Sequence, residues 1–311
     1  MTTGVRQDVV MASSTPDGDR AFDRSVSASP WRSALGTLAR DRSAVAGLVI
    51  LAALALIALA APYVAPYDPR AQPDIVALKY LSPTLAHPFG TDHLSRDVLS
   101  RIIFGSRVSL SVAFLSVVVA ATVGTGYGAV AGYVGGKLDS LMMRIVDALL
   151  SIPRVLLLIA VATLWNGFEL TGLVLLLGLT GWFGVSRLVR TLVLGAREDE
   201  FVTAARALGA THARIFIHHI LPQVISPVLV AATLAIGNVI VIEAGLTFLG
   251  MGVRPPNASW GSIFYDGMRD VAGAWWISIS AGAALVTTVL AVNLVADGLR
   301  EALNARQLPA R

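Results

Sequence analysis

The sequence of 311 residues contains no cysteine and few charged residues. Without cysteine there is no disulfide framework, no thiolate metal site and no cysteine nucleophile. Charged residues make up 14% of the chain, against about 25% in ordinary soluble domains. This shortage excludes a disordered chain, a coiled coil and an ordinary cytosolic enzyme. Because 55% of the residues are hydrophobic, the composition indicates a polytopic membrane protein.

Two catalytic signatures are also missing. A phosphate-binding loop needs Gly, four residues, Gly-Lys and then Ser or Thr. The nearest match, Gly136-Lys137, is followed by Leu138 and has Ala131 where the first Gly should stand. The Gly-x-Ser-x-Gly elbow of many hydrolases is likewise missing from the sequence. We therefore expect no nucleotide site of its own and no catalytic residues.

Long apolar stretches predict an all-α protein with six transmembrane helices, since a span needs roughly 20 mostly apolar residues. The expected spans are 44–62, 108–131, 143–165, 171–190, 224–249 and 275–296. With the N-terminus inside, sixteen Lys and Arg residues fall in inner segments and seven in outer ones. This bias predicts a multi-pass protein of the inner or plasma membrane with both termini cytoplasmic. It also explains the net charge of +4 without a nucleic-acid partner.

The remaining segments flank a six-span domain over 44–306. Residues 1–30 are rich in Ser, Asp, Thr and Arg and predict a disordered cytoplasmic tail. Apolar residues at helical spacing predict an interfacial helix over 31–43, and 307–311 form a short tail. Two segments, 63–107 and 250–274, are expected on the outer side.

The most informative cytoplasmic stretch is the 197–222 loop. One helical face is expected to carry Phe201, Ala204, Ala205 and Leu208. Gly209 is placed to end this helix, and Thr211 can cap a second helix that runs up to Pro222. The pattern predicts helix, glycine turn, helix, joined directly to a span. It fits a surface that a partner protein presses on, and it fits equally an amphipathic helix lying on lipid.

Spacing within the loop resembles the cytoplasmic EAA motif of ABC importer permeases. The matching positions are Thr203-Ala204-Ala205, Gly209 and Leu221-Pro222, although the family usually has Glu where this chain has Thr203. Three further segments resemble permeases of the dipeptide, oligopeptide and nickel group: His87–Leu110, Glu243–Gly261 and Ala296–Arg306. Together they look like the C-type permease of such an importer.

The resemblance implies the type I ABC importer permease fold. It implies an ATPase-coupling loop formed by Thr203, Ala204, Ala205, Leu208, Gly209, Leu221 and Pro222. The implied partners are a second permease, two ATP-binding subunits that hold the ATP, an extracytoplasmic substrate-binding protein and the lipid bilayer. The chain itself would be no enzyme and hold no cofactor. Peptides are the expected cargo, with nickel or haem-like cargo as the alternative.

Charged residues at membrane depth are candidates for function. Glu243 could face the pathway or satisfy a neighbouring helix. Asp147 lies three residues after Arg144 and could neutralise it. Arg154 follows Pro153, which should kink the helix, so that Arg154 could snorkel or line a polar cavity.

Two other classes of function stay open. A proton-coupled secondary transporter could use Glu243 and Asp147, although the chain lacks two matching halves. An intramembrane hydrolase would need a nucleophile and a base, and none can be placed. We expect no metal site, because the neighbouring His218 and His219 point to different helix faces.

Overall fold

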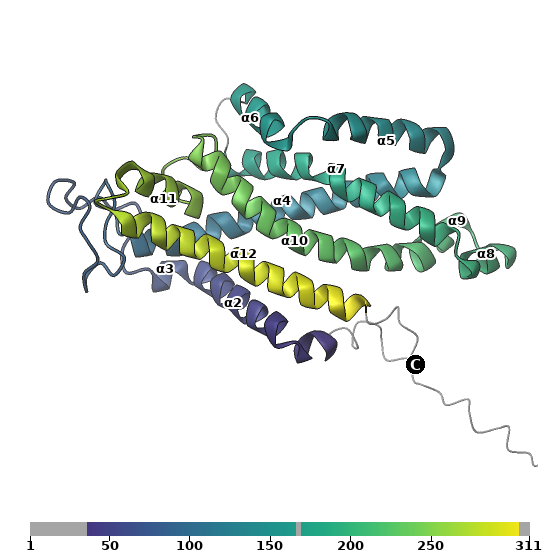
Figure 1. Cartoon of the computed structure of the whole chain (residues 1–311), viewed down its shortest axis with the longest axis horizontal. Helices are drawn as coiled ribbons and strands as arrows, with labels where there is room; N and C mark the ends of the chain where they lie inside the picture. Colours follow the sequence, from purple (N-terminus) through teal and green to yellow (C-terminus); the bar gives the residue numbers. More distant parts are fainter. Residues whose placement is uncertain (1–35, 166–168, 305–311) are drawn as a thin grey trace, which may run out of the picture.

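The computed structural model describes residues 36–165 and 169–304, and these form an elongated bundle of helices (Figure 1). Within these described residues, five helical stretches are long and apolar enough to cross a membrane. They are α2 (Arg42–Leu59), α4 (Val98–Val134), α7 (Leu170–Arg197), the continuous stretch His212–Phe248 and α12 (Trp275–Asn304, of which Trp275–Leu303 meets the span criteria). The all-α fold is confirmed, and α4, α7 and α12 are longer than the spans that the sequence predicted.

The third expected span is not one straight helix. Helix α5 (Gly136–Leu150) and helix α6 (Arg154–Leu164) are bent by 82° across the break at 151–153. Pro153 lies in this break, as its missing N–H and fixed φ require. The two helices lie along one side of the bundle over α7 (Figure 1). Six spans result when this bent pair counts as one.

Helices α4 and α7 pack closely through a row of glycines. The α4 residues are Gly124, Gly128 and Gly132, one every fourth position. A Cβ atom added to these three residues would lie 2.8, 2.2 and 2.8 Å from the carbonyl oxygens of Trp182, Ser186 and Arg190. Only glycine permits two backbones to approach this closely. The close approach increases the van der Waals contact between the two membrane helices.

The first span packs against the last. Gly47 of α2 lies against α12, where an added Cβ would be 2.7 Å from the Ala291 carbonyl oxygen. Asp41 caps α2, and its carboxylate accepts a hydrogen bond from the Ser43 N–H at 2.9 Å. Residues 36–40 are helical, within the expected interfacial helix. Residues 31–35 and the expected tails, 1–30 and 307–311, lie outside the described residues.

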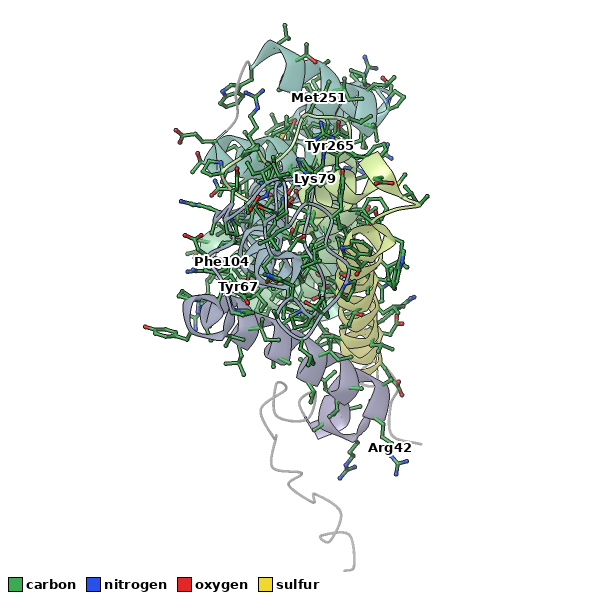
Figure 2. All side chains as sticks on the ribbon, turned by 90° about the vertical axis from the view of Figure 1, so that its left-hand side faces the viewer. Arg42, Tyr67, Lys79, Phe104, Met251 and Tyr265 are labelled. Atoms are coloured by element: carbon green, nitrogen blue, oxygen red, sulfur yellow. The ribbon has the colours of Figure 1, made fainter. Side chains whose placement is uncertain are left out.

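The bundle has two different ends. At one, which we call the α8 end, lie α8 (Glu200–Ala207) and α9 (His212–Ile215), and the start of α2 points toward this end (Figure 1). At the other, the α11 end, lie α3 (Ala61–Val64), the segment 65–97, α11 (Trp260–Gly267) and η2 (Met268–Asp270). Figure 2 looks onto the α11 end, where Tyr67, Lys79 and Tyr265 are labelled.

Candidate functional site

The turn between α8 and α9 is built as its residues predict. Gly209 has a φ of +82°, a left-handed conformation that L side chains rarely adopt. The N–H of Gly209 donates to the Arg206 carbonyl at 3.0 Å, and the N–H of Ala210 donates to the Ala205 carbonyl at 3.1 Å. These two bonds form a Schellman motif that closes α8. Thr211 then caps α9, where its hydroxyl oxygen accepts from the Arg214 N–H at 3.4 Å.

Helix α8 turns an apolar face away from the bundle. Leu208 is 88% exposed and Phe201 is 45% exposed, with Thr203 and Ala204 exposed between them. Ala205 is instead half-buried and packs toward the bundle. The expected single face of Phe201, Ala204, Ala205 and Leu208 is therefore divided, with Ala205 on the inner side.

The inner side of the 197–222 loop is anchored to the bundle. Val202 of α8 and Ile215 of α9 are fully buried in a cluster with Val189 and Val193 of α7. The Tyr133 hydroxyl at the end of α4 donates to the His212 carbonyl at 3.1 Å. It also lies 3.0 Å from the His212 Nδ1. The loop is therefore tied to both α4 and α7.

The helix that begins at α9 does not stop at Pro222, contrary to the expected second helix. A π-helical turn, η1 (Phe216–Ile220), joins α9 to α10 (Leu221–Phe248) without a break. Proline removes one backbone donor, and a π turn lets the chain pass it without ending the helix. Leu221 and Pro222 thus lie inside one continuous helical stretch, His212–Phe248, that connects the 197–222 loop to the far end of α10.

Glu243 is buried in a network of hydroxyl groups toward the α11 end of α10. The Thr247 hydroxyl donates to Glu243 Oε1 at 2.9 Å, and the Ser109 hydroxyl of α4 lies 3.4 Å from Oε2. The Ser109 oxygen also accepts from the Trp260 N–H at 3.1 Å. The carboxyl group therefore links α4, α10 and α11.

The expected pairing of Asp147 with Arg144 is wrong. The Asp147 carboxylate pairs with Arg187 of α7 at 2.5 Å, and both side chains are exposed. One turn from this pair, Arg190 makes two hydrogen bonds of 2.6 Å to the Asp139 carboxylate. The two ion pairs fasten α5 to α7. The i,i+3 spacing favoured a local partner, whereas packing brings α7 closer.

Arg154 lines a small cavity within the bundle, one of the two alternatives left open for it. The cavity has a volume of about 80 Å³ and lies between α4, α7 and α10, with Ser116 and Asn238 among its polar walls. Arg154 Nη2 donates to the Leu177 carbonyl at 3.1 Å. Its buried Nε has no hydrogen-bond partner among the described residues.

Comparisons with known proteins give the chain a family. The family "Binding-protein-dependent transport system inner membrane component" matches residues 124–308, more than half of the chain. The chain belongs to this family. A second match, to the N-terminal transmembrane domain of oligopeptide transport permease C, covers residues 29–83.

Curated relatives of the permease extend over nearly its whole length. A dipeptide transport system permease protein of Alkalihalophilus pseudofirmus is 36% identical over 94% of this chain and 95% of its own. A nickel transport system permease protein of Escherichia coli strain K12 is 40% identical over 83% and 92%. An oligopeptide transport system permease protein of Haemophilus influenzae is 36% identical over 89% and 88%. The permease is thus an ABC importer permease of the peptide and nickel group, which implies ATPase and binding-protein partners.

A solved structure supports the fold of the permease. A chain of the MetNI methionine ABC transporter in an inward-facing conformation matches with a TM-score of 0.52 at 20% identity. The match covers 66% of the permease and 97% of that chain. It shows the type I importer fold that the sequence predicted.

The α11 end of the permease holds an ion-pair cluster that the sequence did not reveal. Asp92 is fully buried and accepts from Arg96 at 2.7 Å and from Arg101. Both arginines also pair with Asp266 of α11, at 3.2 and 2.9 Å. The cluster joins residues more than 160 positions apart, so no local pattern could have predicted it.

Asp92, His93 and Asp266 also bring three potential metal ligands within 4.8 Å of one another. The two arginines already occupy both carboxylates and would repel a cation. The arrangement is therefore an arginine–carboxylate network rather than a metal centre. His87 is paired too, since its Nδ1 lies 2.9 Å from the Asp97 carboxylate.

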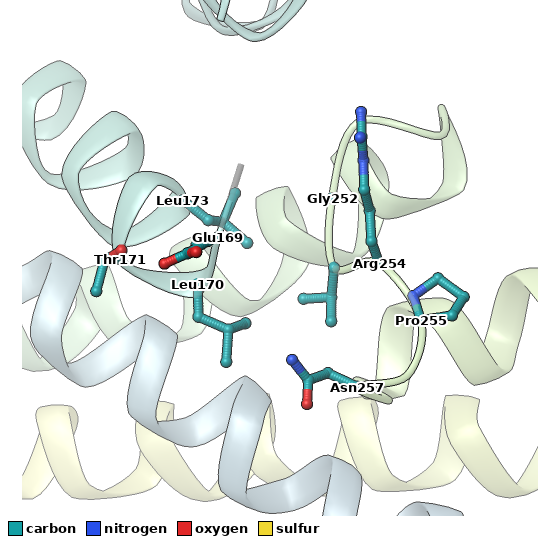
Figure 3. A pocket seen from close by; sticks show the side chains of 9 residues that line it. Glu169, Leu170, Thr171, Leu173, Gly252, Arg254, Pro255 and Asn257 are labelled. Carbon is teal, nitrogen blue, oxygen red and sulfur yellow. The ribbon is translucent and has the colours of Figure 1, made fainter. Parts of the chain in front are cut away.

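A cavity of about 410 Å³ lies between the start of α7 and the loop after α10 (Figure 3). Glu169, Leu170 and Thr171 line it on one side, and Arg254 and Asn257 on the other. Arg254 also lines a second cavity at the same end of the permease.

Proposed function

We propose that the permease is one of two membrane subunits of a peptide importer, driven by ATP-binding subunits that dock on the 197–222 loop. One observation carries the proposal: the apolar face of α8, formed by Phe201, Ala204 and Leu208, is exposed on a loop whose other side is buried. Exposed apolar surface beside an anchored core is typical of a protein interface. A lipid-bound helix would explain the exposed face, but not the tight anchorage of the other side.

The contacts of the loop support a transmission of force. Tyr133 ties the loop to α4, and Val202 and Ile215 tie it to α7. The glycine-packed pair α4–α7 moves most easily as one rigid body, because close-packed backbones resist sliding. The unbroken stretch His212–Phe248 connects the same loop to the opposite end. Closure of ATP-binding subunits would thus rotate whole helices, a rigid-body form of alternating access.

We place the α8 end in the cytoplasm and the α11 end outside. The excess of Lys and Arg in the segments at the α8 end supports this orientation. Both termini would then be cytoplasmic, and a substrate-binding protein would deliver cargo to the α11 end. The α2 span is only 17% buried within the chain, which leaves apolar surface for lipid and for the second permease.

Peptides are the cargo we propose, on the names of the dipeptide and oligopeptide relatives. A relative named for nickel transport is 40% identical, so nickel is the second candidate, and haem-like cargo follows. An uptake assay decides between peptide and nickel cargo. It uses vesicles that hold both permeases, the ATP-binding subunits and the binding protein, and it measures entry of radiolabelled dialanine and of radioactive nickel. Dialanine uptake that needs ATP supports the proposal, and uptake of nickel alone overturns the peptide assignment.

The proton-coupled alternative has little support from the geometry. Glu243 is held by hydroxyl groups and Asp147 by an arginine, and no described contact joins the two. Vesicles with an imposed proton gradient and no ATP test the alternative. Cargo uptake under that condition would contradict the ABC importer proposal.

A further inference from the structure

The second cavity at the α11 end is strongly basic. It has a volume of about 590 Å³ and is bounded by the segment around Arg70, the loop after α10 and α11. Five arginines line it: Arg70, Arg96, Arg101, Arg254 and Arg269. A volume of this size falls within the range of about 300–1,000 Å³ that is common for small-molecule sites.

Within the described part of the chain, two of these five arginines form ion pairs with carboxylates. Arg96 and Arg101 share the carboxylates of Asp92 and Asp266. Across the described residues, no carboxylate lies within ion-pair distance of Arg70, Arg254 or Arg269. With both aspartates counted, five positive and two negative charges leave the cavity with an excess of three positive charges.

One further polar atom beside this cavity has no partner among the described residues. His93 lines the cavity, and its buried Nδ1 has no hydrogen-bond partner among the described residues. A buried ring nitrogen without a partner costs free energy unless a ligand satisfies it. Three arginines without a carboxylate partner among the described residues therefore line one cavity, and the His93 ring lines it too.

Guanidinium groups bind carboxylates through paired N–H donors and exclude cations. We propose that this cavity is a carboxylate-binding site at the outer end of the permease. The carboxylate comes from the C-terminus of the transported peptide or from an acidic side chain of the protein that delivers it. The two sources of the carboxylate rest on the proposed function, whereas the carboxylate site itself rests only on the residues of the cavity.

A binding measurement without ATP tests the site. The probes are radiolabelled dialanine and dialanine amide, which lacks the carboxylate, added to the complete transporter in lipid nanodiscs. The test variant is Arg70→Gln/Arg254→Gln/Arg269→Gln, and Arg→Lys at the same three positions keeps the charges. Lys79→Gln is the matched control, because Lys79 is exposed at the same end and does not line the cavity.

For a cargo carboxylate we expect dialanine to bind at least tenfold more tightly than its amide, as charge-assisted hydrogen bonds of this kind contribute about that factor. The triple Gln variant should lose the difference, while the triple Lys variant retains part of it. If both probes behave alike, but the triple Gln variant weakens binding of the delivering protein at least tenfold, the carboxylate belongs to that protein. Either result supports a carboxylate site.

Two results would overturn the site. One is a triple Gln variant that binds dialanine and the delivering protein as the native permease does. The other is a Lys79→Gln variant that weakens binding as much, which would mean a diffuse effect of charge. ATP-driven uptake by the native transporter, measured in parallel, keeps the inference separate from the proposed function. Intact uptake with unchanged binding contradicts only the carboxylate site.

Discussion

Leu208 offers a direct way to test the docking face of α8. Full burial of a leucine side chain is worth about 1.5–3 kcal/mol. Leu208 is 88% exposed in the isolated permease, so nearly all of that free energy is left for a partner. Leu208→Ala should therefore weaken binding of the ATP-binding subunits by about 2 kcal/mol, or roughly 30-fold. The stability of the permease should change by less than about 0.5 kcal/mol, since an exposed side chain makes few internal contacts.

Titration of labelled ATP-binding subunits onto the two permeases in nanodiscs measures the effect. The matched control is Leu164→Ala, because Leu164 at the end of α6 is 86% exposed and lies far from the loop (Figure 1). We expect the control to bind within twofold of the native permease. If Leu208→Ala also binds within twofold and unfolds at the normal temperature, the exposed face of α8 does not contact the ATP-binding subunits.

Three further predictions concern the turn, the α5–α7 contact and the α11 end. Gly209→Ala should destabilise the turn by about 1 kcal/mol through its φ of +82° alone, since an added Cβ meets nothing within 4 Å. Proteolysis of the loop should then be about fivefold faster, and Gly209→Asn should have a smaller effect. Asp139→Asn should destabilise the permease by about 2 kcal/mol, because it leaves the partly buried Arg190 unpaired. Asp147→Asn removes an exposed ion pair and should destabilise it by less than about 1 kcal/mol. Thermal unfolding of the two variants measures the difference. Burial lowers the pKa of His93, so the folded chain holds fewer protons than the unfolded chain and loses stability as the pH falls below about 6.5. His93→Gln should flatten this dependence in unfolding temperatures measured from pH 8 to 5, and an unchanged slope would exclude His93 as its cause.

Local signals were enough to predict the shape of the 197–222 loop. Gly209 and Thr211 act on neighbouring backbone groups, and their roles as end and cap of a helix depend on a few adjacent residues. Pro153 likewise predicted the break after α5. The direction of the 82° bend could not be predicted, because it depends on where α7 lies.

The faces of the loop could not be assigned from periodicity. Ala204 and Ala205 are neighbours of the same type, and only the packing of Val202 and Ile215 on α7 decides which alanine turns inward. The same limit applies to charged residues. Asp147 has a partner 40 residues away, and long-range partners of this kind leave no trace in local spacing.

Glu243 shows a further limit of sequence reasoning. Its position within an apolar stretch predicted a residue with a special role, and the structure places it in a network with Thr247 and Ser109. Glu243 therefore stays a candidate for the pathway, together with Arg154 and its small cavity.

We expect ATP-binding subunits to dock on the outward face of α8. Because the native chain has no cysteine, Ala204→Cys supplies a single thiol on that face, and Ala65→Cys supplies one at the α11 end. In the complete transporter, a short thiol cross-linker should join the permease to an ATP-binding subunit through position 204 and not through position 65. The cross-linked complex should lose ATP-driven uptake. Cross-linking through position 65 instead, or full uptake with a bulky label at position 204, would contradict the claim.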